Sequence, residues 1–506
     1  MAGAVPAVHG ATRLLAQMNP APGGPFQATH ASLDGYEVPA WYRDAKFGIW
    51  AHWGPQSAPE AGDWYARNMY MQGSEQYDFH VAHYGHPSKF GFKDVINTWK
   101  GDQFDPEHLV GLYKKAGARY FVSMGVHHDN FDMWNSKHQR WNVTKLGIKR
   151  DVVGEFKKAA RNNNLRFGVS DHLWISYKWF AVSHMSDKTG PLAGVPYDGV
   201  NPANADLYHS YDDPKLITAK LDWNDVGIPD SWKAEWLLRI KDLVDQAEPD
   251  YLYSDGPIPF GDRGLELAAY LYNQSARKHG GKTEAVYTSK RTEDCAKGAC
   301  VLDHERSVIE TMSDAAWQTD TCVGDWHYKK GIQYKTPKIV VDMLVDVVSR
   351  GGNLLLNFPL PNSGMLDSQE LGILEEITKW NATNGEAIFA TRPWKIYGFS
   401  PTPLLSDQSK EDFNEKLRRE LTAEDVRFTT QGKTLYAFVM GVPDKSAKIS
   451  SLGIGGSQNV GKIENVELLG HPGKLTFQQD ASGLTITLPE EKPARYALAF
   501  KIAGAI

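Results

Sequence analysis

The sequence predicts an α/β fold, a (β/α)8 TIM-like barrel followed by a C-terminal all-β sandwich domain. Between about residues 46 and 385, short apolar runs alternate with capped segments whose apolar residues recur every 3.6 positions. From about residue 391 onward the period changes to 2. The chain has 506 residues, of which 42% are hydrophobic, enough for at least two domains. We expect an N-terminal extension over residues 1–40, a barrel domain over 41–385 and a β-sandwich domain over 391–506.

Eight apolar runs in the first part of the chain are candidate strands, because each is short and they alternate with helical segments. They are "KFGIWAHWG" (46–54), "ARYFVSMGVHHD" (118–129), "LRFGVSDH" (165–172), "DYLYSD" (250–255), "EAVYTS" (284–289), "CVLDHE" (300–305), "AWQTD" (316–320) and "GNLLLNF" (352–358). Eight parallel strands with helical connections predict a closed barrel.

Helix signals separate these runs. Asp105 and Asp151 are N-cap residues for the helices that follow them, and Thr336-Pro337 opens another. We expect helices over residues 105–116, 152–164, 231–247, 265–278, 338–350 and 368–380. The stretch 180–224, rich in Gly, Pro, Asp and Tyr, is expected to be an insertion over one mouth of the barrel.

The C-terminal part shows alternating apolar residues between Gly, Pro and Asp turns, which is typical of antiparallel strands. The expected strands are "KTLYAFVMG" (433–441), "IENVELLG" (463–470), "KLTFQQ" (474–479), "LTITLP" (484–489) and "RYALAFKI" (495–502). This segment therefore forms a separate all-β domain.

Charge and hydropathy exclude several classes of partner. The chain has 55 Lys and Arg against 61 Asp and Glu, with no basic run, so nucleic acid is not an expected partner. No window reaches the roughly 18 consecutive apolar residues of a membrane span. The sequence is compatible with a homo-oligomer as well as with a monomer.

The cysteine residues and the N-terminal segment indicate the compartment in which the protein is found. Cys295 and Cys300 flank the short loop "CAKGAC", which permits a local disulfide but equally two free thiols. The Ala/Pro/Gly-rich start lacks the features of a secretory signal peptide. It is compatible with a segment that remains after such a signal peptide has been cleaved off. We expect a secreted or periplasmic protein.

Ionisable residues lie at four strand ends, and in this barrel class the C-terminal ends of the strands form the active site. They are His52, the run His127-His128-Asp129, Asp255, and the run Asp303 to Arg306. A zinc site is the main rival interpretation, but adjacent residues of a regular strand point to opposite faces. His127 and His128 can both face inward only if the strand breaks or bulges there. We expect no metal and read the histidines as hydrogen-bond partners of a polar ligand.

Two carboxylates, Asp255 and Glu305, sit on the fourth and sixth expected strands. Such a pair suits glycoside cleavage, in which one carboxylate attacks the anomeric carbon and the other exchanges a proton, without metal or organic cofactor. Singly, each residue has a plainer explanation: Asp255 as a turn residue before Gly256-Pro257, Glu305 as an ion-pair partner of Arg306.

Three long stretches resemble signature regions of glycoside hydrolase family 29, the α-L-fucosidases. They are "KFGIWAHWGPQSAPEAGDWYARNMY", "GARYFVSMGVHHDNFDMWNS" and "SRGGNLLLNFPLPNSGML", and the similarity runs in blocks from about Trp41 to Leu366. The resemblance implies a retaining exo-hydrolase that removes terminal α-L-fucose from oligosaccharides or glycoconjugates through a covalent fucosyl-enzyme. Fucosylated glycans are the implied partners, and the barrel-plus-sandwich layout fits the family.

The resemblance also implies roles for individual residues. Asp255 matches the family's nucleophile, and His52, Trp64, His127 and His128 lie in the matching sugar-binding blocks. Asp63 can fix ring hydroxyls, while Trp64 offers an apolar face to the sugar, although core burial would also explain this tryptophan. Where many members have a tyrosine in a Gly-x-Tyr context, this chain reads "GVSDHLW". Ser170, Asp171 or His172 must serve there, and we choose His172.

The acid/base has no block shared by the whole family. "DHERS" followed by "AWQTDTCVGDWHY" resembles the branch that cleaves α-1,3/1,4-linked fucose in Lewis-type glycans, and on that similarity we choose Glu305, with Glu310 and Glu293 as rivals. We expect Glu305 in an apolar or anionic setting while Asp255 stays ionised. Trp317 and Trp326 are expected to shape the rim of the site.

Two other functions remain open from the sequence. One is a carbohydrate-binding barrel that lost turnover, although both carboxylates are present. The other is a metal-dependent hydrolase that uses His127, His128 and Asp255. Activity that survives chelation would remove the second alternative.

Overall fold

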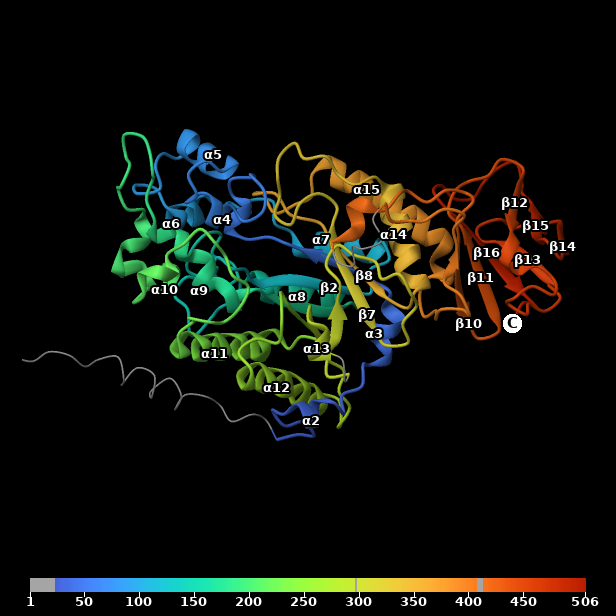
Figure 1. The fold of residues 1–506 in the computed structure, drawn as a ribbon, viewed down its shortest axis with the longest axis horizontal. Helices are drawn as coiled ribbons and strands as arrows, with labels where there is room; N and C mark the ends of the chain where they lie inside the picture. Colours follow the sequence, from blue (N-terminus) through green and yellow to red (C-terminus); the bar gives the residue numbers. More distant parts are fainter. Residues whose placement is uncertain (1–22, 296–297, 407–412) are drawn as a thin grey trace, which may run out of the picture.

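The computed structural model describes residues 23–295, 298–406 and 413–506. Figure 1 shows a helix-covered barrel joined to a smaller region of sheets that carries the C-terminus. The expected barrel and C-terminal sheets are both confirmed.

Eight parallel strands close the barrel in chain order, and the first pairs with the last. Each contains the centre of one expected run, and nearly all of their residues are buried. The strands are β1 (Phe47–Ala51), β2 (Tyr120–Val126), β3 (Arg166–Asp171), β4 (Tyr251–Ser254), β5 (Val286–Ser289), β6 (Val301–Asp303), β7 (Trp317–Cys322) and β8 (Asn353–Asn357).

Long helices cover the outside of the barrel and follow the expected caps. The side chains of Asp105, Asp151 and Thr336 accept hydrogen bonds from first-turn amides, so each helix starts where an oxygen satisfies a free N–H. These helices are α7 (Pro106–Lys115), α8 (Val152–Asn162), α11 (Asp230–Ala247), α12 (Asp262–Lys278), α14 (Pro337–Ser349) and α15 (Ser368–Asn384).

Short helices fill the connections. One of them, α10, belongs to the expected insertion after β3, which reaches the C-terminal mouth of the barrel through Trp223. The short helices are α2 (His30–Leu33), α3 (Ala40–Ala45), α4 (Tyr65–Asn68), α5 (Glu75–His83), α6 (Phe92–Val95), α9 (Ser176–Trp179), α10 (Ala205–Tyr208) and α13 (Thr292–Cys295).

Ten 3-10 turns lie beside these helices, two of them in the C-terminal part of the chain. They are η1 (Pro55–Ser57), η2 (Ile96–Thr98), η3 (Leu173–Ile175), η4 (Phe180–His184), η5 (Asp198–Val200), η6 (Pro202–Asn204), η7 (Pro214–Leu216), η8 (Gly385–Ala387), η9 (Asn414–Leu417) and η10 (Ser450–Leu452) among the described residues.

The C-terminal region consists of two antiparallel sheets around a shared apolar core. The first has the order β13-β16-β11-β10-β9 and the second β12-β15-β14. The period-2 pattern missed three of these strands, β9, β10 and β12. The bounds are β9 (Gly398–Phe399), β10 (Val426–Gln431), β11 (Thr434–Val439), β12 (Ser446–Ile449), β13 (Asn465–Leu468), β14 (Phe477–Asp480), β15 (Gly483–Thr487) and β16 (Leu498–Ala503).

A buried ion pair connects the two regions. Arg427 of β10 donates to Asp346 of α14 at 2.5 Å, and both side chains are almost fully buried. The three arginines around Asp346, namely Arg350, Arg418 and Arg427, hold the pKa of this carboxyl far below its usual range although burial alone would raise it. The sheets are therefore fixed to the barrel helix that precedes β8.

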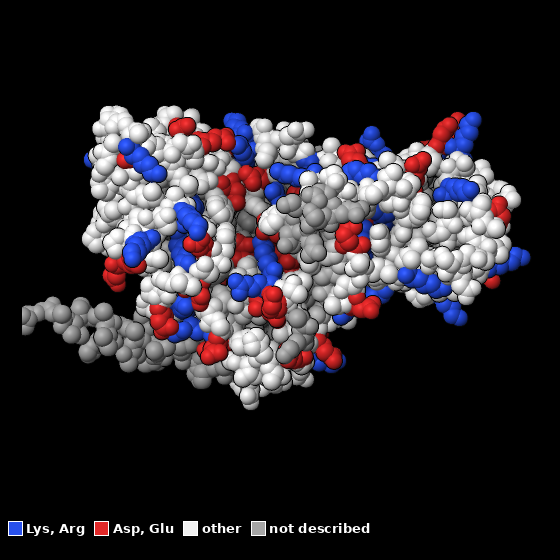
Figure 2. All heavy atoms as spheres, viewed as in Figure 1, with Lys and Arg blue, Asp and Glu red and all other residues white. Residues whose placement is uncertain are grey.

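A disulfide joins Cys295 and Cys300, so the first of the two alternatives for this pair is correct. None of the helices among the described residues combines the length and the apolar character that a membrane span requires. Acidic and basic side chains alternate over the face shown in Figure 2, without a single-sign patch over either region.

Candidate functional site

A cavity of about 460 Å³ opens at the C-terminal ends of the barrel strands. Its lining combines aromatic faces with ionisable groups, the composition expected of a site for a polar ring with apolar faces. The residues are Trp50, His52, Asp63, Trp64, His127, His128, His172, Trp223, Tyr253, Asp255, Gly256, Lys290, Glu305, Asp320, Trp326 and Phe413.

The two adjacent histidines both reach the cavity because β2 is irregular at its end. The pairing of β2 with β3 shifts register between Met124 and Val126, and the strand stops before His127. Gly125 permits this shift, since a Cβ there would lie 2.6 Å from Leu243 and 2.8 Å from the Ser170 carbonyl oxygen. This irregularity meets the condition under which both histidines can face inward.

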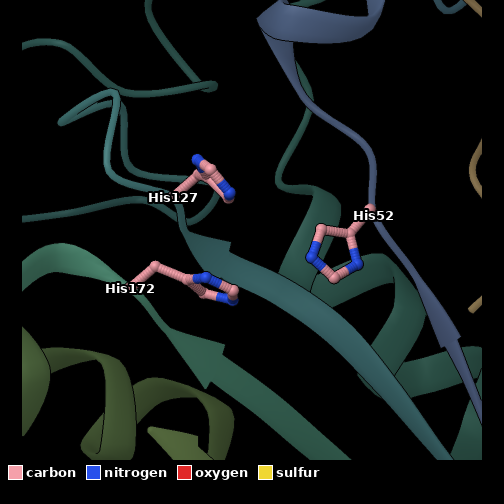
Figure 3. Close-up of side chains that lie close together, drawn as sticks. All are labelled: His52, His127 and His172. Carbon is pink, nitrogen blue, oxygen red and sulfur yellow. The ribbon is translucent and has the colours of Figure 1, made fainter. Parts of the chain in front are cut away.

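Three strand ends each contribute an imidazole to one side of the cavity. Figure 3 shows His52 after β1, His127 after β2 and His172 after β3, with their rings turned toward a common space. Burial, reinforced by the neighbouring histidines, lowers the pKa of His52 and of His127 well below the usual value, and burial lowers that of His172 to about 4. Neutral imidazoles can both donate and accept hydrogen bonds.

The partners of each ring fix which nitrogen carries the proton. Asn357 Oδ1 already accepts from the His52 amide, so His52 Nδ1, 3.0 Å away, is a donor and Nε2 an acceptor. The Gln56 amide nitrogen lies 2.8 Å from His127 Nδ1, which makes Nε2 of His127 the donor. The cavity thus presents both kinds of partner to a hydroxyl group.

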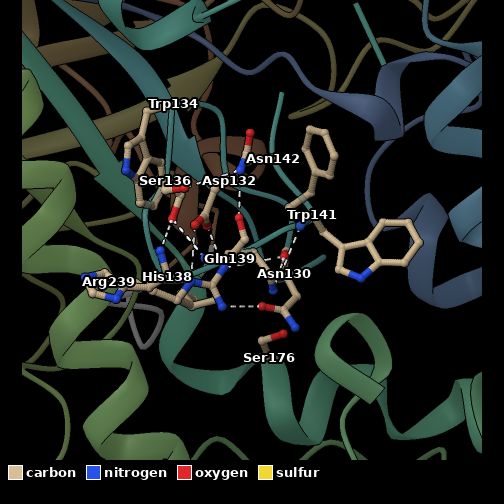
Figure 4. A network of polar contacts seen from close by, with 12 residues as sticks. Asn130, Asp132, Trp134, Ser136, His138, Gln139, Trp141, Asn142, Ser176 and Arg239 are labelled. Carbon is tan, nitrogen blue, oxygen red and sulfur yellow. Dashed lines mark hydrogen bonds and ion pairs between the residues drawn. The ribbon is translucent and has the colours of Figure 1, made fainter. Parts of the chain in front are cut away.

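The loop after β2 is held by a buried polar network (Figure 4). Arg239 of α11 donates to Asp132 at 2.5 Å and to the Asn130 side chain at 2.6 Å, with no exposure of the arginine or aspartate side chain. Asn130 in turn donates to the carbonyl oxygen of Leu207 in the insertion. The network fixes the backbone directly after His127 and His128.

Asp255 follows β4 and contacts one cation and two imidazoles. Its Oδ2 lies 3.1 Å from His128 Nε2 and 3.2 Å from His172 Nδ1, and its Oδ1 lies 2.5 Å from Lys290 Nζ. Burial disfavours the charged form, but Lys290 and the two histidines outweigh burial and hold the pKa of Asp255 well below its usual range. The expectation that Asp255 stays ionised agrees with this environment.

Glu305 faces Asp255 across the same lysine. Lys290 Nζ lies 2.5 Å from Glu305 Oε2, so the two carboxylate oxygens that it contacts are at most about 5 Å apart. Asp320 lies close enough to Glu305 for the charge of Glu305 to raise its pKa. The expected anionic neighbour is therefore present, but the sequence interpretation did not include the cation between the carboxylates.

Asp63 and two tryptophans complete the predicted part of the site. Asp63 Oδ1 contacts His327 Nδ1 at 2.6 Å, and Trp326 packs 5.1 Å from the His52 ring, measured between ring centroids. Trp64 adopts a positive φ of 59°. A tryptophan in this conformation costs free energy, a feature that is common where a side chain is aimed at a ligand.

The prediction for Trp317 is wrong. This residue opens β7, and its indole packs outward with Val308 and Val347 of α14 while Nε1 donates to the Arg350 carbonyl oxygen. It lies at the N-terminal end of the strand, a strand length from the mouth, so its position on β7 excludes a role at the rim.

The rivals for the acid/base do not line the cavity. Glu293 is exposed on α13, and the Glu310 side chain is 55% exposed and pairs with Arg418. Glu305 is the acidic side chain of these three that faces Asp255.

Several lining residues were missed. Lys290 directly follows one expected strand, and Asp320 belongs to another. Their place on strands of a predicted barrel was the signal that could have assigned them to the site. Trp223 comes from the insertion and Phe413 from the segment before η9. These two residues are 45% and 59% exposed, and no local pattern in the sequence placed them at the mouth.

Three sets of side chains lie close enough to hold a cation: His52, His127 and His172; Asp63, His127 and His327; and His128, His172 and Asp255. The third set includes Asp255, which already contacts the ammonium group of Lys290. A divalent cation there would meet a positive charge at close range. Lys290 therefore disfavours a divalent cation at the third set.

Comparison with known proteins identifies both parts of the chain. Residues 14–386 match the family model described as alpha-L-fucosidase, and residues 418–503 match the alpha-L-fucosidase C-terminal domain. Tissue alpha-L-fucosidase of Rattus norvegicus is 26% identical, over 92% of this chain and 89% of the relative. Plasma alpha-L-fucosidase of Homo sapiens is also 26% identical, over 95% and 93%.

Solved structures share the fold. A Thermotoga maritima alpha-fucosidase in complex with fucose has a TM-score of 0.69 and 23% identity, covering 95% of this chain and 100% of the other. Alpha-L-fucosidase isoenzyme 1 from Paenibacillus thiaminolyticus has a TM-score of 0.62 and 17% identity, covering 92% and 97%.

Proposed function

The chain belongs to the α-L-fucosidase family, and from that premise we propose that it is a retaining exo-enzyme with Asp255 as nucleophile and Glu305 as acid/base. Family membership makes the protein a glycoside hydrolase that releases fucose. The proposal concerns how the reaction proceeds and on which glycans.

The imidazoles and Asp63 bind the ring hydroxyls of a terminal fucose. His127 offers a donor and His52 an acceptor, while Trp64 and Trp326 cover apolar parts of the ring. Because both histidines are neutral, the cavity adds no positive charge at this end. Binding energy from these contacts holds the anomeric carbon beside Asp255.

The reaction takes two displacements. Asp255 attacks the anomeric carbon while Glu305 donates its proton to the leaving oxygen, which gives a covalent fucosyl-enzyme. Water then attacks the same carbon, its proton passes to Glu305, and the bond to Asp255 breaks. The product keeps the α configuration.

The single observation that carries this proposal is the contact of one lysine with both carboxylates. It limits the distance between the contacted oxygens of Asp255 and Glu305 to about 5 Å. Retaining enzymes have a separation of about 5 to 5.5 Å, whereas inverting enzymes need about 6.5 to 9.5 Å to admit a water molecule. A second support is the low pKa of Asp255, because a nucleophile must be ionised.

We assign the natural substrates to α-1,3/1,4-linked fucose in Lewis-type glycans. The support is the resemblance around "DHERS" and the exposed aromatic rings of Trp223 and Phe413 at the mouth, which can stack on the neighbouring sugar. A secreted or periplasmic location fits the disulfide Cys295–Cys300, since disulfides persist in oxidising compartments.

The test is an assay of the purified chain on a Lewis-type trisaccharide and an aryl α-L-fucoside, with the anomer of the first product followed by proton NMR. We expect fucose from both, as the α anomer first, with the trisaccharide preferred. Initial β-fucose would overturn the retaining mechanism. Release from neither substrate would favour the carbohydrate-binding alternative.

A further inference from the structure

Glu305 lies on a turn beyond the end of its strand. The strand, β6, is three residues long, and the Ser307 amide closes the turn on the His304 carbonyl oxygen at 3.2 Å. One side of the turn is held by β7, because the Arg306 amide donates to the Asp320 carbonyl oxygen at 2.8 Å. The other side faces the connection between the barrel and the C-terminal sheets.

Asn414 and Glu415 of η9 cover this other side of the turn. The Glu415 amide donates to the Arg306 carbonyl oxygen at 3.0 Å, and the Asn414 amide donates to Ser307 Oγ at 3.2 Å. The Asn414 side chain exchanges two hydrogen bonds with the backbone of Val308, both at 3.2 Å. The turn is therefore held between β7 and a segment that is remote in the sequence.

This supporting segment lies outside both ranges that match the fucosidase family. The matches cover residues 14–386 and 418–503, and Asn414 and Glu415 fall between them. Their contacts with the turn are thus a feature of this chain that the family matches do not include.

The Glu415 side chain is 6% exposed and lies between two cations. Its Oε1 is 3.4 Å from Arg306 Nε and 3.3 Å from Lys335 Nζ, and its Oε2 accepts from the Thr321 hydroxyl at 2.6 Å. Arg306 has a further partner in Cys322, whose Sγ accepts from Nη2 at 2.8 Å. The guanidinium group is therefore fixed on the side of β7 and η9.

Arg306 is the direct sequence neighbour of Glu305, yet the two side chains have different ion-pair partners. Glu305 pairs with Lys290, whereas Arg306 pairs with Glu415. Burial alone would lower the pKa of Arg306, but Cys322, Glu415 and Glu305 together raise it, so Glu305 lies within reach of the guanidinium charge. Arg306 also has a φ of 50°, a strained conformation for this residue type, at the point where the two side chains diverge.

We propose that Glu415 is a positioning residue for the acid/base, because it holds Arg306 away from Glu305 and so keeps the Glu305 carboxyl group in the catalytic cavity. The inference rests on the proposed function, in which Glu305 donates a proton to the leaving oxygen. Glu415 does not line the cavity and acts through Arg306. Without the carboxylate of Glu415, the guanidinium group turns toward the adjacent carboxylate of Glu305. A second cation on Glu305 opposes the protonated form that the first displacement needs.

Glu415→Gln tests the role of the charge. The variant keeps the size of the side chain and an acceptor for the Thr321 hydroxyl, but it removes the partner of Arg306. We expect kcat/KM on a Lewis-type trisaccharide to fall by roughly tenfold to a hundredfold, and on an activated aryl α-L-fucoside by much less. The reason is that only the poor leaving group needs the proton from Glu305. Equal losses on both substrates, or no loss on either, would overturn the inference.

The double variant Arg306→Met/Glu415→Gln separates positioning from a merely structural role. Removal of the guanidinium group also removes the competing cation, so the double variant should recover most of the trisaccharide activity that Glu415→Gln loses. If Glu415 only stabilised the junction, the two changes would give losses that add. A double variant no better than Glu415→Gln would therefore contradict the proposal.

Two variants at the same junction serve as controls. Lys416→Ala changes an exposed neighbour of Glu415 and should behave like the wild type with both substrates. Arg418→Met removes a partner of Asp346, so it should lower stability in denaturant unfolding but leave the ratio of the two kcat/KM values unchanged. A changed ratio in Arg418→Met would show that general loosening of the junction causes the effect, and the inference would fall.

Glu305→Ala, assayed on the same two substrates, distinguishes failure of this inference from failure of the proposed function. If Glu305→Ala loses the trisaccharide selectively and Glu415→Gln does not, the acid/base assignment stands and the positioning role of Glu415 is wrong. If Glu305→Ala loses both substrates equally, the acid/base assignment itself is wrong, and the inference that rests on it falls as well.

Discussion

Lys290 lies between Asp255 and Glu305, and its ammonium nitrogen is 2.5 Å from one carboxylate oxygen of each. The three side chains come from three successive strand ends, those of β4, β5 and β6. A lysine in this place stabilises the ionised form of Asp255. It also forms an ion pair with Glu305, and this ion pair must break when Glu305 is protonated. The reaction cycle is thus coupled to the position of one ammonium group.

Asp255→Ala should lower kcat by at least about a thousandfold, because it removes the carboxylate that attacks in the first displacement. Asp222→Ala provides a matched control, since Asp222 is an exposed partner of Lys220. Steady-state kinetics on an aryl α-L-fucoside measure both. Near-normal turnover of Asp255→Ala would remove the nucleophile assignment.

Lys290→Met should move the acidic limb of the pH–rate profile to higher pH. Burial raises the pKa of Asp255 and Lys290 is the largest opposing influence, so loss of the cation lets the pKa rise. Because the nucleophile must be ionised, activity then disappears at a less acidic pH. A full pH profile of kcat/KM for both proteins measures the shift, and an unchanged acidic limb would show that the histidines alone keep Asp255 ionised.

Glu305→Ala should reduce hydrolysis of the trisaccharide far more than that of an activated aryl fucoside, because only the poor leaving group needs a proton. Glu310→Ala, a change of the same type at an exposed position, should behave like the wild type with both substrates. The ratio of kcat/KM values for the two substrates is the readout. Equal losses on both substrates would argue against an acid role for Glu305.

Arg239→Met should destabilise the protein by about 3 to 5 kcal/mol, because it leaves the charge of Asp132 buried without its partner. The loop that carries His127 and His128 depends on the same arginine through Asn130, so KM should rise as well. Denaturant unfolding and steady-state kinetics give the two values. Arg140→Met, at a half-exposed position, should change stability by less than about 1 kcal/mol.

The barrel was predictable because each of its strands is a short apolar run and each long helix carries its own cap. Asp105, Asp151 and Thr336 show this most clearly, since the same oxygen atoms that suggested the helix starts accept the first-turn amides. The strand β10 was missed because "VRFTTQ" places a buried arginine, Arg427, where an alternating pattern has a polar, exposed residue.

The site residues that could be predicted are those that directly follow an apolar strand as ionisable side chains. His127, His128 and Asp255 are of this kind, and the irregular end of β2 resolves the apparent conflict of two adjacent inward histidines. Lys290 was not found, because its role depends on two partners 35 and 15 residues away. Trp317 was assigned from residue type alone, and only the direction of β7 shows that it faces away.

The most direct test of the account is to trap the covalent intermediate with a 2-deoxy-2-fluoro fucosyl fluoride and to locate the label by peptide mass spectrometry. The fluorine slows both displacements, but the good leaving group speeds the first, so the fucosyl-enzyme should accumulate. We predict one fluorofucosyl group per chain, on the peptide that contains Asp255. A label on Glu305, or hydrolysis of the reagent without any label, would contradict the assignment of the two carboxylates.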